Sequence, residues 1–349
     1  MASFGGIDLG GTKIQAAIVD EDSSVLGSAR RPTPTSGGPP DIAREMGTAL
    51  RDAAAAAEVE PHALAGVGVG SPGTVRGGEV SRARNLPDWE APFALGPELE
   101  RLLGCPVALG NDVRVATMAE FRLGAGRLYR SLLGVFWGTG VGGGLILDGR
   151  PWVGRGAAGE IGHVVVEIDG ARCTCGRRGC MEAYAGRAAM EAHAEYLHRE
   201  KRRRTDLFKL MDEHGRTRLT SGVWARALEH GDKLAVHIID RAVRALGAGV
   251  ASVMNVLDVE GIVIGGGLGV RLGHPYAKRI ADAMVPHLFT DDDPPAVHVA
   301  ALGDLGGAIG ASLLVREHEP DGAGGVTPAQ AARPAATASP PPGVTVPRP

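Results

Sequence analysis

Aromatic residues are scarce in this 349-residue chain, at 4% of the total, and there are only four cysteines. An excess of one charge is also missing, because 37 Lys and Arg residues are balanced by 40 Asp and Glu residues, for a net charge of −3. Such a chain lacks the positive field that non-specific nucleic-acid binding needs, so we expect no nucleic-acid partner. Its 44% hydrophobic content is nevertheless enough to form a sizeable core.

Long hydrophobic runs are missing as well. The longest uncharged apolar stretch, Ser131–Leu147, contains six glycines and is shorter than the roughly 20 apolar residues that span a bilayer. We interpret it as two strands joined by a turn. The first residues, MASFGGIDLGG, have no basic segment followed by an apolar run, which a secretory signal would show. We therefore expect no membrane association, and the few cysteines fit a reducing cytoplasm.

Glycine, by contrast, is abundant: the chain has 53, about twice the usual share of about 7%. They follow no G-X-Y period, which excludes a collagen. From Glu317 onward the chain holds eight of its 23 prolines together with Ala, Gly, Ser and Thr, without any period. This composition predicts a disordered tail over 317–349.

Short apolar runs alternate with longer helical patterns, which predicts an α/β fold. The predicted strands are Phe4–Leu9, Ile14–Val19, Val25–Ser28, Leu64–Val69, Val107–Leu109, Leu132–Trp137, Leu145–Leu147, Ile262–Ile264 and Ala296–Ala300. The predicted helices are Asp41–Glu58, a helix from Asp112 toward Phe121, Ala183–His198, Gly222–Glu229, Lys233–Leu257, Pro275–Leu288 and Ala308–Arg316. A strand–glycine–strand hairpin occurs in each half of the chain. This duplication favours two similarly built lobes with a cleft between them.

The first glycine loop, Asp8–Lys13, lies between two predicted strands. A Rossmann or Walker A loop opens a helix instead, so neither a dehydrogenase nor a P-loop enzyme is favoured. Glycines let backbone N–H groups approach a phosphate, Thr12 and Lys13 offer further donors, and Asp8 is suited to a hydrated magnesium ion. Taken alone, the loop is explained equally well as a plain hairpin turn.

Two more glycine loops occur at predicted strand ends, at Gly138–Gly144 and Gly265–Gly267. The first of these repeats the Gly-Thr hairpin of the opening loop. Three such loops distributed over two lobes suit a nucleotide that lies in the cleft. Its phosphates would contact both hairpins, and its adenosine would lie against the third loop.

Asn111 and Asp112 follow a predicted strand and stand at a probable helix start. Judged locally, capping of the helix is the more frequent role for such residues. In a cleft, however, an Asp can accept the proton of a substrate hydroxyl as that oxygen attacks a γ-phosphoryl group. Asp112 is thus a candidate general base, and Asn111 would fix the orientation of the substrate.

His163 and the cysteines at 173, 175 and 180 have a spacing that is typical of metal ligands. Three thiolates and one imidazole make a closed tetrahedral set, which is typical of structural zinc. The alternative is a cluster of free thiols. A zinc ion here would hold Glu160, His163 and Glu182 rigidly for a binding site.

Eight motifs together resemble one family in the order in which they occur. They are DLGGTK (8–13), GSPGTV (70–75), NLPDW (85–89), GND (110–112), GTGVGGG (138–144), GEIGH (159–163), CTCGRRGCME (173–182) and VIGGGL (263–268). Over about residues 4–316 the chain is similar to the ROK family of bacterial sugar kinases, and within it to the ATP-dependent glucokinase branch.

The resemblance implies an actin-like, ribonuclease-H-like kinase of two lobes that closes over a hexose and MgATP. The small lobe would comprise residues 1–112 and a C-terminal helix at about 305–316. The large lobe would comprise residues 113–304 and include a zinc loop at 163–180. Members of the family are commonly homodimers or homotetramers.

The resemblance also implies roles for individual residues. Asp112 would take the proton from the 6-hydroxyl of glucose, giving glucose 6-phosphate and ADP. The implied sugar ligands are Asn85, Asn111, Asp112, Glu160, His163 and Glu182, with His163 also binding zinc. The implied nucleotide site is made of Asp8, Gly10, Gly11, Thr12, Lys13, Gly138, Thr139, Gly140, Gly265, Gly266 and Gly267. The implied zinc ligands are His163, Cys173, Cys175 and Cys180.

Other substrates and one other class of protein fit the same motifs. Kinases of N-acetylglucosamine, N-acetylmannosamine or mannose share them, and a sugar-sensing protein without catalysis would share most. The presence of Asp112 with all three glycine loops favours a kinase over a sensor. Polyphosphate is a less favoured donor, since polyphosphate glucokinases of the family lack the zinc cysteines. The chain departs from a common N-D-A-N pattern at Val113 and Arg114, and its segment 201–220 is longer than in a minimal member.

Overall fold

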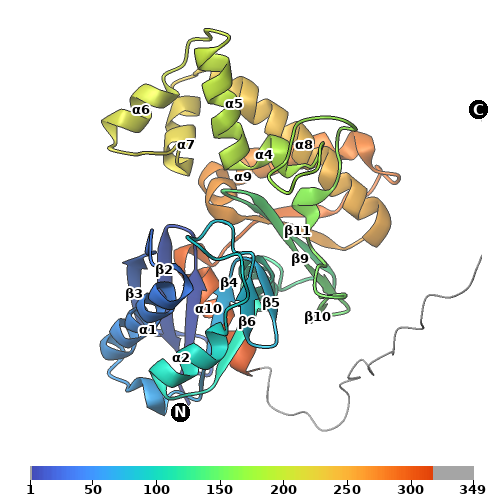
Figure 1. The fold of residues 1–349 in the computed structure, drawn as a ribbon. Helices are drawn as coiled ribbons and strands as arrows, with labels where there is room; N and C mark the ends of the chain where they lie inside the picture. Colours follow the sequence, from blue (N-terminus) through green and yellow to red (C-terminus); the bar gives the residue numbers. More distant parts are fainter. Residues whose placement is uncertain (1, 317–349) are drawn as a thin grey trace, which may run out of the picture. The chain divides into compact units, whose positions relative to one another are not determined.

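The computed structural model describes residues 2–316. The tail predicted to be disordered, 317–349, lies outside the described residues. Two five-stranded mixed sheets organise the described chain (Figure 1). The predicted α/β fold with mixed sheets is therefore confirmed. No helix in this part of the chain is long and apolar enough to cross a membrane.

The first sheet has the strand order β3-β2-β1-β4-β7. Its strands are β1 (Phe4–Leu9), β2 (Lys13–Val19), β3 (Val25–Pro32), β4 (Gly66–Ser71) and β7 (Val107–Asn111). The first three strands pair antiparallel, whereas β4 pairs parallel with both β1 and β7. Because parallel strands end at the same edge, the residues that follow β1, β4 and β7 meet there.

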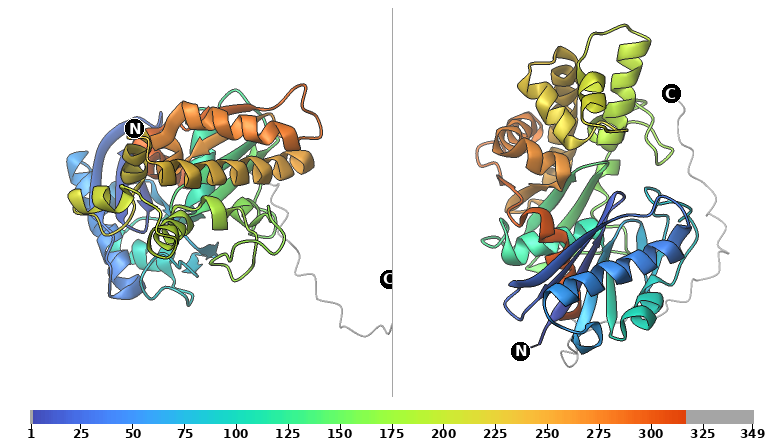
Figure 2. Two further views of the ribbon diagram at one scale, coloured as in Figure 1. Left: turned by 90° about the horizontal axis from the view of Figure 1, so that it is seen from above. Right: turned by 90° about the vertical axis from the view of Figure 1, so that its left-hand side faces the viewer.

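Helices cover both faces of this sheet. Figure 2 shows α1 (Gly38–Ala56) along one face, where a Cβ built on Gly5 would contact Leu50 of that helix. The next residue, Gly6, faces the opposite way, toward α10 (Gly306–Arg316). A Cβ built on Gly6 would overlap the carbonyl oxygen of Ala308, so α10 lies directly on the strand backbone.

The second sheet has the order β10-β9-β8-β11-β12. Its strands are β8 (Leu132–Trp137), β9 (Val141–Leu147), β10 (Arg150–Pro151), β11 (Gly261–Gly265) and β12 (Ala296–Val299). As in the first sheet, an antiparallel hairpin is followed by strands that pair parallel with it and with each other. The duplicated hairpin that the sequence predicted is therefore confirmed.

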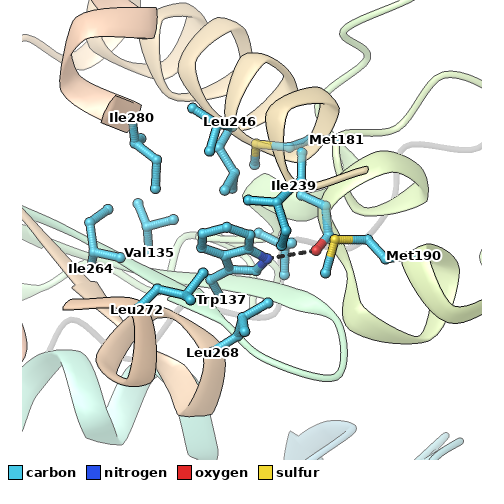
Figure 3. Packing of buried hydrophobic residues seen from close by; sticks show 14 of the residues in the cluster. Val135, Trp137, Met181, Met190, Ile239, Leu246, Ile264, Leu268, Leu272 and Ile280 are labelled. Atoms are coloured by element: carbon cyan, nitrogen blue, oxygen red, sulfur yellow. Dashed lines mark hydrogen bonds between the residues drawn. The ribbon is translucent and has the colours of Figure 1, made fainter. Parts of the chain in front are cut away.

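The apolar core beside the second sheet includes many buried residues of α8 (Lys233–Leu257) and α9 (Gly266–Met284). Trp137 stands at its centre, fully buried among side chains such as Ile239 and Leu268 (Figure 3). The indole N–H of Trp137 donates to the carbonyl of Ala185 at 2.7 Å, which satisfies its one polar group. The core thereby fixes the end of β8, from which a glycine loop begins.

The remaining elements connect or cover these sheets. They are β5 (Thr74–Arg76), β6 (Glu79–Ser81), α2 (Leu95–Leu103), α3 (Asp112–Leu123), α4 (Glu182–Ala185), α5 (Arg187–Arg199), α6 (Leu207–Glu213) and α7 (Ser221–Glu229). Among these, α2, α6 and the β5–β6 hairpin were not predicted, since each is short. The helix α2 does carry a helical signal that was missed, because it buries Leu95, Leu99 and Leu103 at a spacing of four residues.

Two predicted helices have different bounds in the structure. The single helix expected over Ala183–His198 is divided at Gly186, whose extended backbone separates α4 from α5. The helix expected at Pro275–Leu288 begins earlier, at Gly266, and is kinked at Gly273, where φ is 64°. Pro275 is typical of a helix start, and it follows the kink. The prediction therefore began there and missed the first turns of α9.

Candidate functional site

Two carboxylates meet where the parallel strands of the first sheet end. Asp8 is near the end of β1 and pairs in register with Gly70 of β4, while Asp112 is the first residue of α3, directly after β7. A Cβ built on Gly70 would lie 3.5 Å from the Cα of Asp112. Gly70 thus lies directly beside the start of α3.

Burial and neighbouring charge change the protonation of both acids. The pKa of Asp112 is raised to about 7, mainly by burial and then by the negative charge of Asp8, with a smaller contribution from Glu160. The N–H of Val113 donates to its Oδ1 at 2.9 Å and acts in the opposite direction. Burial also raises the pKa of Asp8, although Lys13 lowers it. Asp112 can therefore exchange a proton near neutral pH.

Asn111 joins the start of α3 to the turn between β4 and β5. Its Oδ1 accepts from the backbone N–H of Arg114 at 3.3 Å, which caps α3. Its Nδ2 donates to the carbonyl oxygen of Gly73 at 3.4 Å. The helix cap is thus Asn111, and the carboxylate of Asp112 accepts from the N–H of Val113, the next residue in the chain.

The first glycine loop is a tight turn, closed by the N–H of Gly10 on the carbonyl of Lys13 at 2.9 Å. The hydroxyl of Thr33 donates to the carbonyl of Gly10 at 2.7 Å. Lys13, predicted to contact phosphate, has another partner in the structure, because its Nζ lies 2.7 Å from Asp304 Oδ1. That ion pair connects the loop to the segment that leads into α10.

Asn85 is brought next to this loop although the two are far apart in sequence. A Cβ built on Gly11 would lie 3.2 Å from both Nδ2 and the carbonyl oxygen of Asn85. Asn85 itself is exposed. A predicted sugar ligand and a predicted nucleotide loop therefore adjoin.

The second glycine loop, 138–144, is held by the start of α5. The N–H of Arg187 donates to the carbonyl of Gly138 at 3.1 Å, and that of Ala188 donates to the carbonyl of Thr139 at 3.0 Å. The side chain of Thr139 is exposed at the tip of the loop. Its Oγ1 accepts from Nη2 of Arg187 at 2.8 Å.

The third glycine loop lies beside the second. Gly266 adopts a φ of 78° at the start of α9, and a Cβ there would lie 2.6 Å from the carbonyl oxygen of Trp137. A Cβ built on Gly138 would lie 3.9 Å from the nitrogen of Gly267. Gly222 of α7 lines a cavity of about 220 Å³ between α6, α7 and α9, and Ser221 lies against Gly267.

The four predicted metal ligands converge, with their ligand atoms within 4.8 Å of one another. The sulfur atoms of Cys175 and Cys180 are 3.7 Å apart, and His163 Nδ1 is 3.8 Å from the sulfur of Cys173. A tetrahedral zinc ion with bonds of about 2.3 Å places its sulfur ligands about 3.8 Å apart. The donor set and its spacing therefore fit zinc.

The metal cluster is connected to the predicted sugar ligands. His163 presents Nδ1 to the cysteines and Nε2 to Glu160, whose Oε2 is 4.0 Å away. Oε2 of Glu182 accepts from the N–H of Val141 at 3.0 Å, and its Oε1 accepts from the hydroxyl of Thr174 at 3.3 Å. Glu182 thus joins the second glycine loop to the cysteine loop.

Two residues of α3 that no motif assigned to the site join it to other parts of the chain. Arg114 donates from Nη2 to the carbonyl of Gly156 at 3.1 Å, which joins α3 to the loop before Glu160. Buried Glu120 accepts from the N–H groups of Ala301 and Leu302 at 2.9 and 3.0 Å. Only Arg114 had a sequence signal, its departure from the N-D-A-N pattern.

The chain is similar to known sugar kinases over most of its length. The chain is 32% identical over 318 residues to a glucokinase of Thermotoga maritima, covering 89% of this chain and 96% of the relative. It is also 32% identical to an N-acetylmannosamine kinase of Citrobacter koseri, covering 89% and 97%. A solved ROK family glucokinase from Streptomyces griseus, in complex with glucose and AMPPNP, is 30% identical with a TM-score of 0.77, covering 90% of this chain and all of that one. The ROK family model matches residues 4–318, and the chain belongs to the ROK family.

Proposed function

We propose that this chain is an ATP-dependent glucokinase, in which Asp112 is the general base. The observation that carries the proposal is the place of Asp112 at the carboxyl end of β7, beside Asp8, with its pKa raised to about 7. Such a pKa suits proton transfer at neutral pH. The glucokinases among the similar proteins, including the one solved with glucose and AMPPNP, support ATP and glucose as the substrates.

In the proposed reaction, Asp112 accepts the proton of the glucose 6-hydroxyl as that oxygen bonds to the γ-phosphorus of ATP. The bond from that phosphorus to the bridging oxygen breaks, and ADP leaves with the electron pair. Asp8 has the carboxylate chemistry that a hydrated magnesium ion prefers, and such an ion would neutralise phosphate charge. The protein thus contributes mainly the positioning of the two substrates and a base whose pKa is about 7.

The sugar would be held by hydroxyl contacts from Asn85, Asn111, Glu160, His163 and Glu182. The geometry of His163 supports a double role, because Nδ1 faces the cysteines while Nε2 faces Glu160. A structural zinc ion would supply rigidity to the loop that carries these groups. Its ligands would be His163 and the three cysteines of the cluster.

The nucleotide would contact the three glycine loops, with its phosphates at Gly10–Thr12 and Gly138–Gly140 and its adenosine near Gly265–Gly267. The start of α7 supports this arrangement, since Ser221 lies against Gly267. The lobes would divide at about residue 112, with the C-terminal helix returning to the first lobe and the sugar and nucleotide meeting in the cleft between them. As in the family, a homodimer or homotetramer is the proposed assembly.

A coupled ADP-release assay over a panel of hexoses tests the substrate. Glucose should give the highest kcat/KM, with product identified as glucose 6-phosphate. The similarity to an N-acetylmannosamine kinase makes N-acetylated hexoses the second candidates, and the panel includes them with mannose. A preference for one of these sugars would change the proposed substrate, and the proposed kinase activity would still hold. Tight sugar binding without turnover on any hexose would instead indicate a sugar sensor.

A further inference from the structure

Arg187, the first residue of α5, lies directly behind the 138–144 loop. Its Nη2 donates to Thr139 Oγ1 at 2.8 Å, and its Nη1 donates to the carbonyl of Leu219 at 3.2 Å. Its Nε–H is buried and has no hydrogen-bond partner within residues 2–316. Buried donors without a partner are rare in folded proteins, so this N–H group is available to a ligand or a water molecule.

The charge of Arg187 is compensated only from a distance, by Glu191, within residues 2–316. Burial lowers its pKa, Glu191 raises it, and the positive charge of Arg218 lowers it again. Both carboxylate oxygens of Glu191 accept from Nε of Arg218, at 3.1 and 3.2 Å. Arg187 itself forms no ion pair in the part of the chain that the structure describes. Because buried cations are ordinarily paired, this guanidinium is suited to an anion.

The contact with Arg187 sets the direction in which Thr139 can donate. Because Thr139 Oγ1 accepts from the guanidinium, its own hydrogen remains free for a different acceptor. The Thr139 side chain is exposed, whereas Arg187 is partly buried behind it. An anionic oxygen in front of the loop would therefore receive the hydroxyl hydrogen and feel the positive charge behind it.

Lys13 is less suited to this role, because Asp304 already occupies its ammonium group. We propose that Arg187 is a positioning residue for the nucleotide, which orients the Thr139 hydroxyl toward a phosphate oxygen and supplies positive charge behind the loop. This inference rests on the nucleotide site proposed above. It assigns to Arg187 the charge that the sequence motif places on Lys13.

Arg187→Met and Thr139→Val test the proposal by steady-state kinetics and by calorimetry with AMPPNP. Each variant should raise the KM for ATP and the Kd for AMPPNP at least fivefold, while the KM for glucose stays within twofold. The double variant should be little worse than Arg187→Met, because both changes remove one coupled interaction. Arg187→Lys keeps the charge and should recover part of the affinity. Arg279→Met is the control, since Arg279 pairs with Asp240 at 2.6 Å and should leave all constants within twofold.

Folded Arg187→Met with unchanged AMPPNP affinity would overturn the proposal, as would an equal loss of glucose affinity. If Arg187→Met does not fold, Thr139→Val decides, because that side chain is exposed and its loss should not affect folding. Unchanged AMPPNP binding in Thr139→Val then excludes the mechanism. Calorimetry measures AMPPNP binding whether or not any hexose is phosphorylated. A failure of the glucokinase proposal can therefore be told apart from a failure of the role proposed for Arg187. A wild-type protein that binds no AMPPNP would overturn the nucleotide site and this inference together.

Discussion

At the scale of single residues, Asp112 combines two opposed properties. Its burial and the neighbouring Asp8 raise its pKa to about 7, which suits a base but makes the ionised form unfavourable in the folded protein. An Asp that is ionised in the unfolded chain above about pH 4 must either bind a proton or keep an unfavourable charge on folding. The candidate base therefore lowers stability at neutral pH.

We expect Asp112→Asn to raise the melting temperature at pH 8. The sign follows from the raised pKa: the stability associated with Asp112 is fully present below the unfolded value, 3.8, and is lost as the pH rises through about 7. The gain from the substitution should therefore disappear below about pH 4. Calorimetric melting between pH 3.5 and 8 measures it, with Asp148→Asn as a control whose side chain is 93% exposed. An Asp112→Asn variant that melts at or below wild type at pH 8 contradicts the account.

The position of Asp112 was predictable from sequence, but its environment was not. The GND motif at a strand end identified the residue as a base or a cap. Its pKa is raised first by burial and then by Asp8, which the parallel pairing of β1, β4 and β7 brings beside it from far along the chain. The pairing of Lys13 with Asp304 is equally non-local, so the DLGGTK motif, which offered Lys13 as a phosphate donor, gave no sign of it.

At the scale of elements, glycines set how closely α10 approaches the first sheet. Gly68 of β4 faces α10, and a Cβ there would overlap the carbonyl oxygen of Ala311. Gly6 makes the same kind of contact with Ala308 from the neighbouring strand. Because backbone atoms cannot yield as a flexible side chain can, both positions require glycine.

Gly68→Ala should lower the free energy of unfolding by about 2–3 kcal/mol, because the added methyl must displace α10. Gly47→Ala in α1 is the matched control. Its Cβ would meet only Arg51 and Leu102, at 3.5 Å or more, so the substitution should raise stability by about 0.5–1 kcal/mol through helix propensity. Urea unfolding of both variants checks the pair. Equal effects of the two substitutions would show that the approach of α10 is not limited by Gly68.

Elements with strong patterns were predictable, and short ones were not. The strands Phe4–Leu9 and Leu132–Trp137 and the helix Lys233–Leu257 have the predicted bounds, since each is a buried apolar run or a long periodic segment. The helix α6 was missed because it has seven residues and buries only Leu207 and Leu210. This helix is stabilised by packing against α7, a tertiary contact that the local pattern of apolar residues does not reveal.

At the scale of the whole molecule, the cysteine cluster connects separate parts of the site. His163 joins it to Glu160, and Glu182 joins the cysteine loop to the 138–144 loop. The cysteine loop contains no helix or strand between His163 and Glu182. It folds tightly, because a Cβ on Gly179 would overlap the carbonyl oxygen of Glu167. Cross-linking by a metal is therefore expected to supply much of its rigidity.

Metal analysis should find about one zinc per chain. Removal by a chelator, or Cys175→Ser, should lower the melting temperature and weaken sugar binding at least tenfold, with a smaller effect on AMPPNP. The reason is that His163 and Glu182 are proposed sugar ligands held by the cluster. Cys105→Ala is the control, because Cys105 is buried in the core of the first sheet and should leave the metal content unchanged. Full activity and normal melting of a zinc-free protein would contradict the structural role.

Asp112 is proposed to take the proton during phosphoryl transfer to glucose, and the variant Asp112→Asn removes that ability. Turnover is measured by ADP release with glucose and MgATP at saturation, and glucose binding by calorimetry on the same preparation. The account predicts that kcat falls by at least a thousandfold while the Kd for glucose changes less than threefold, since the amide keeps the shape of the carboxylate but cannot accept the proton. An Asp112→Asn variant with kcat within tenfold of wild type would contradict it.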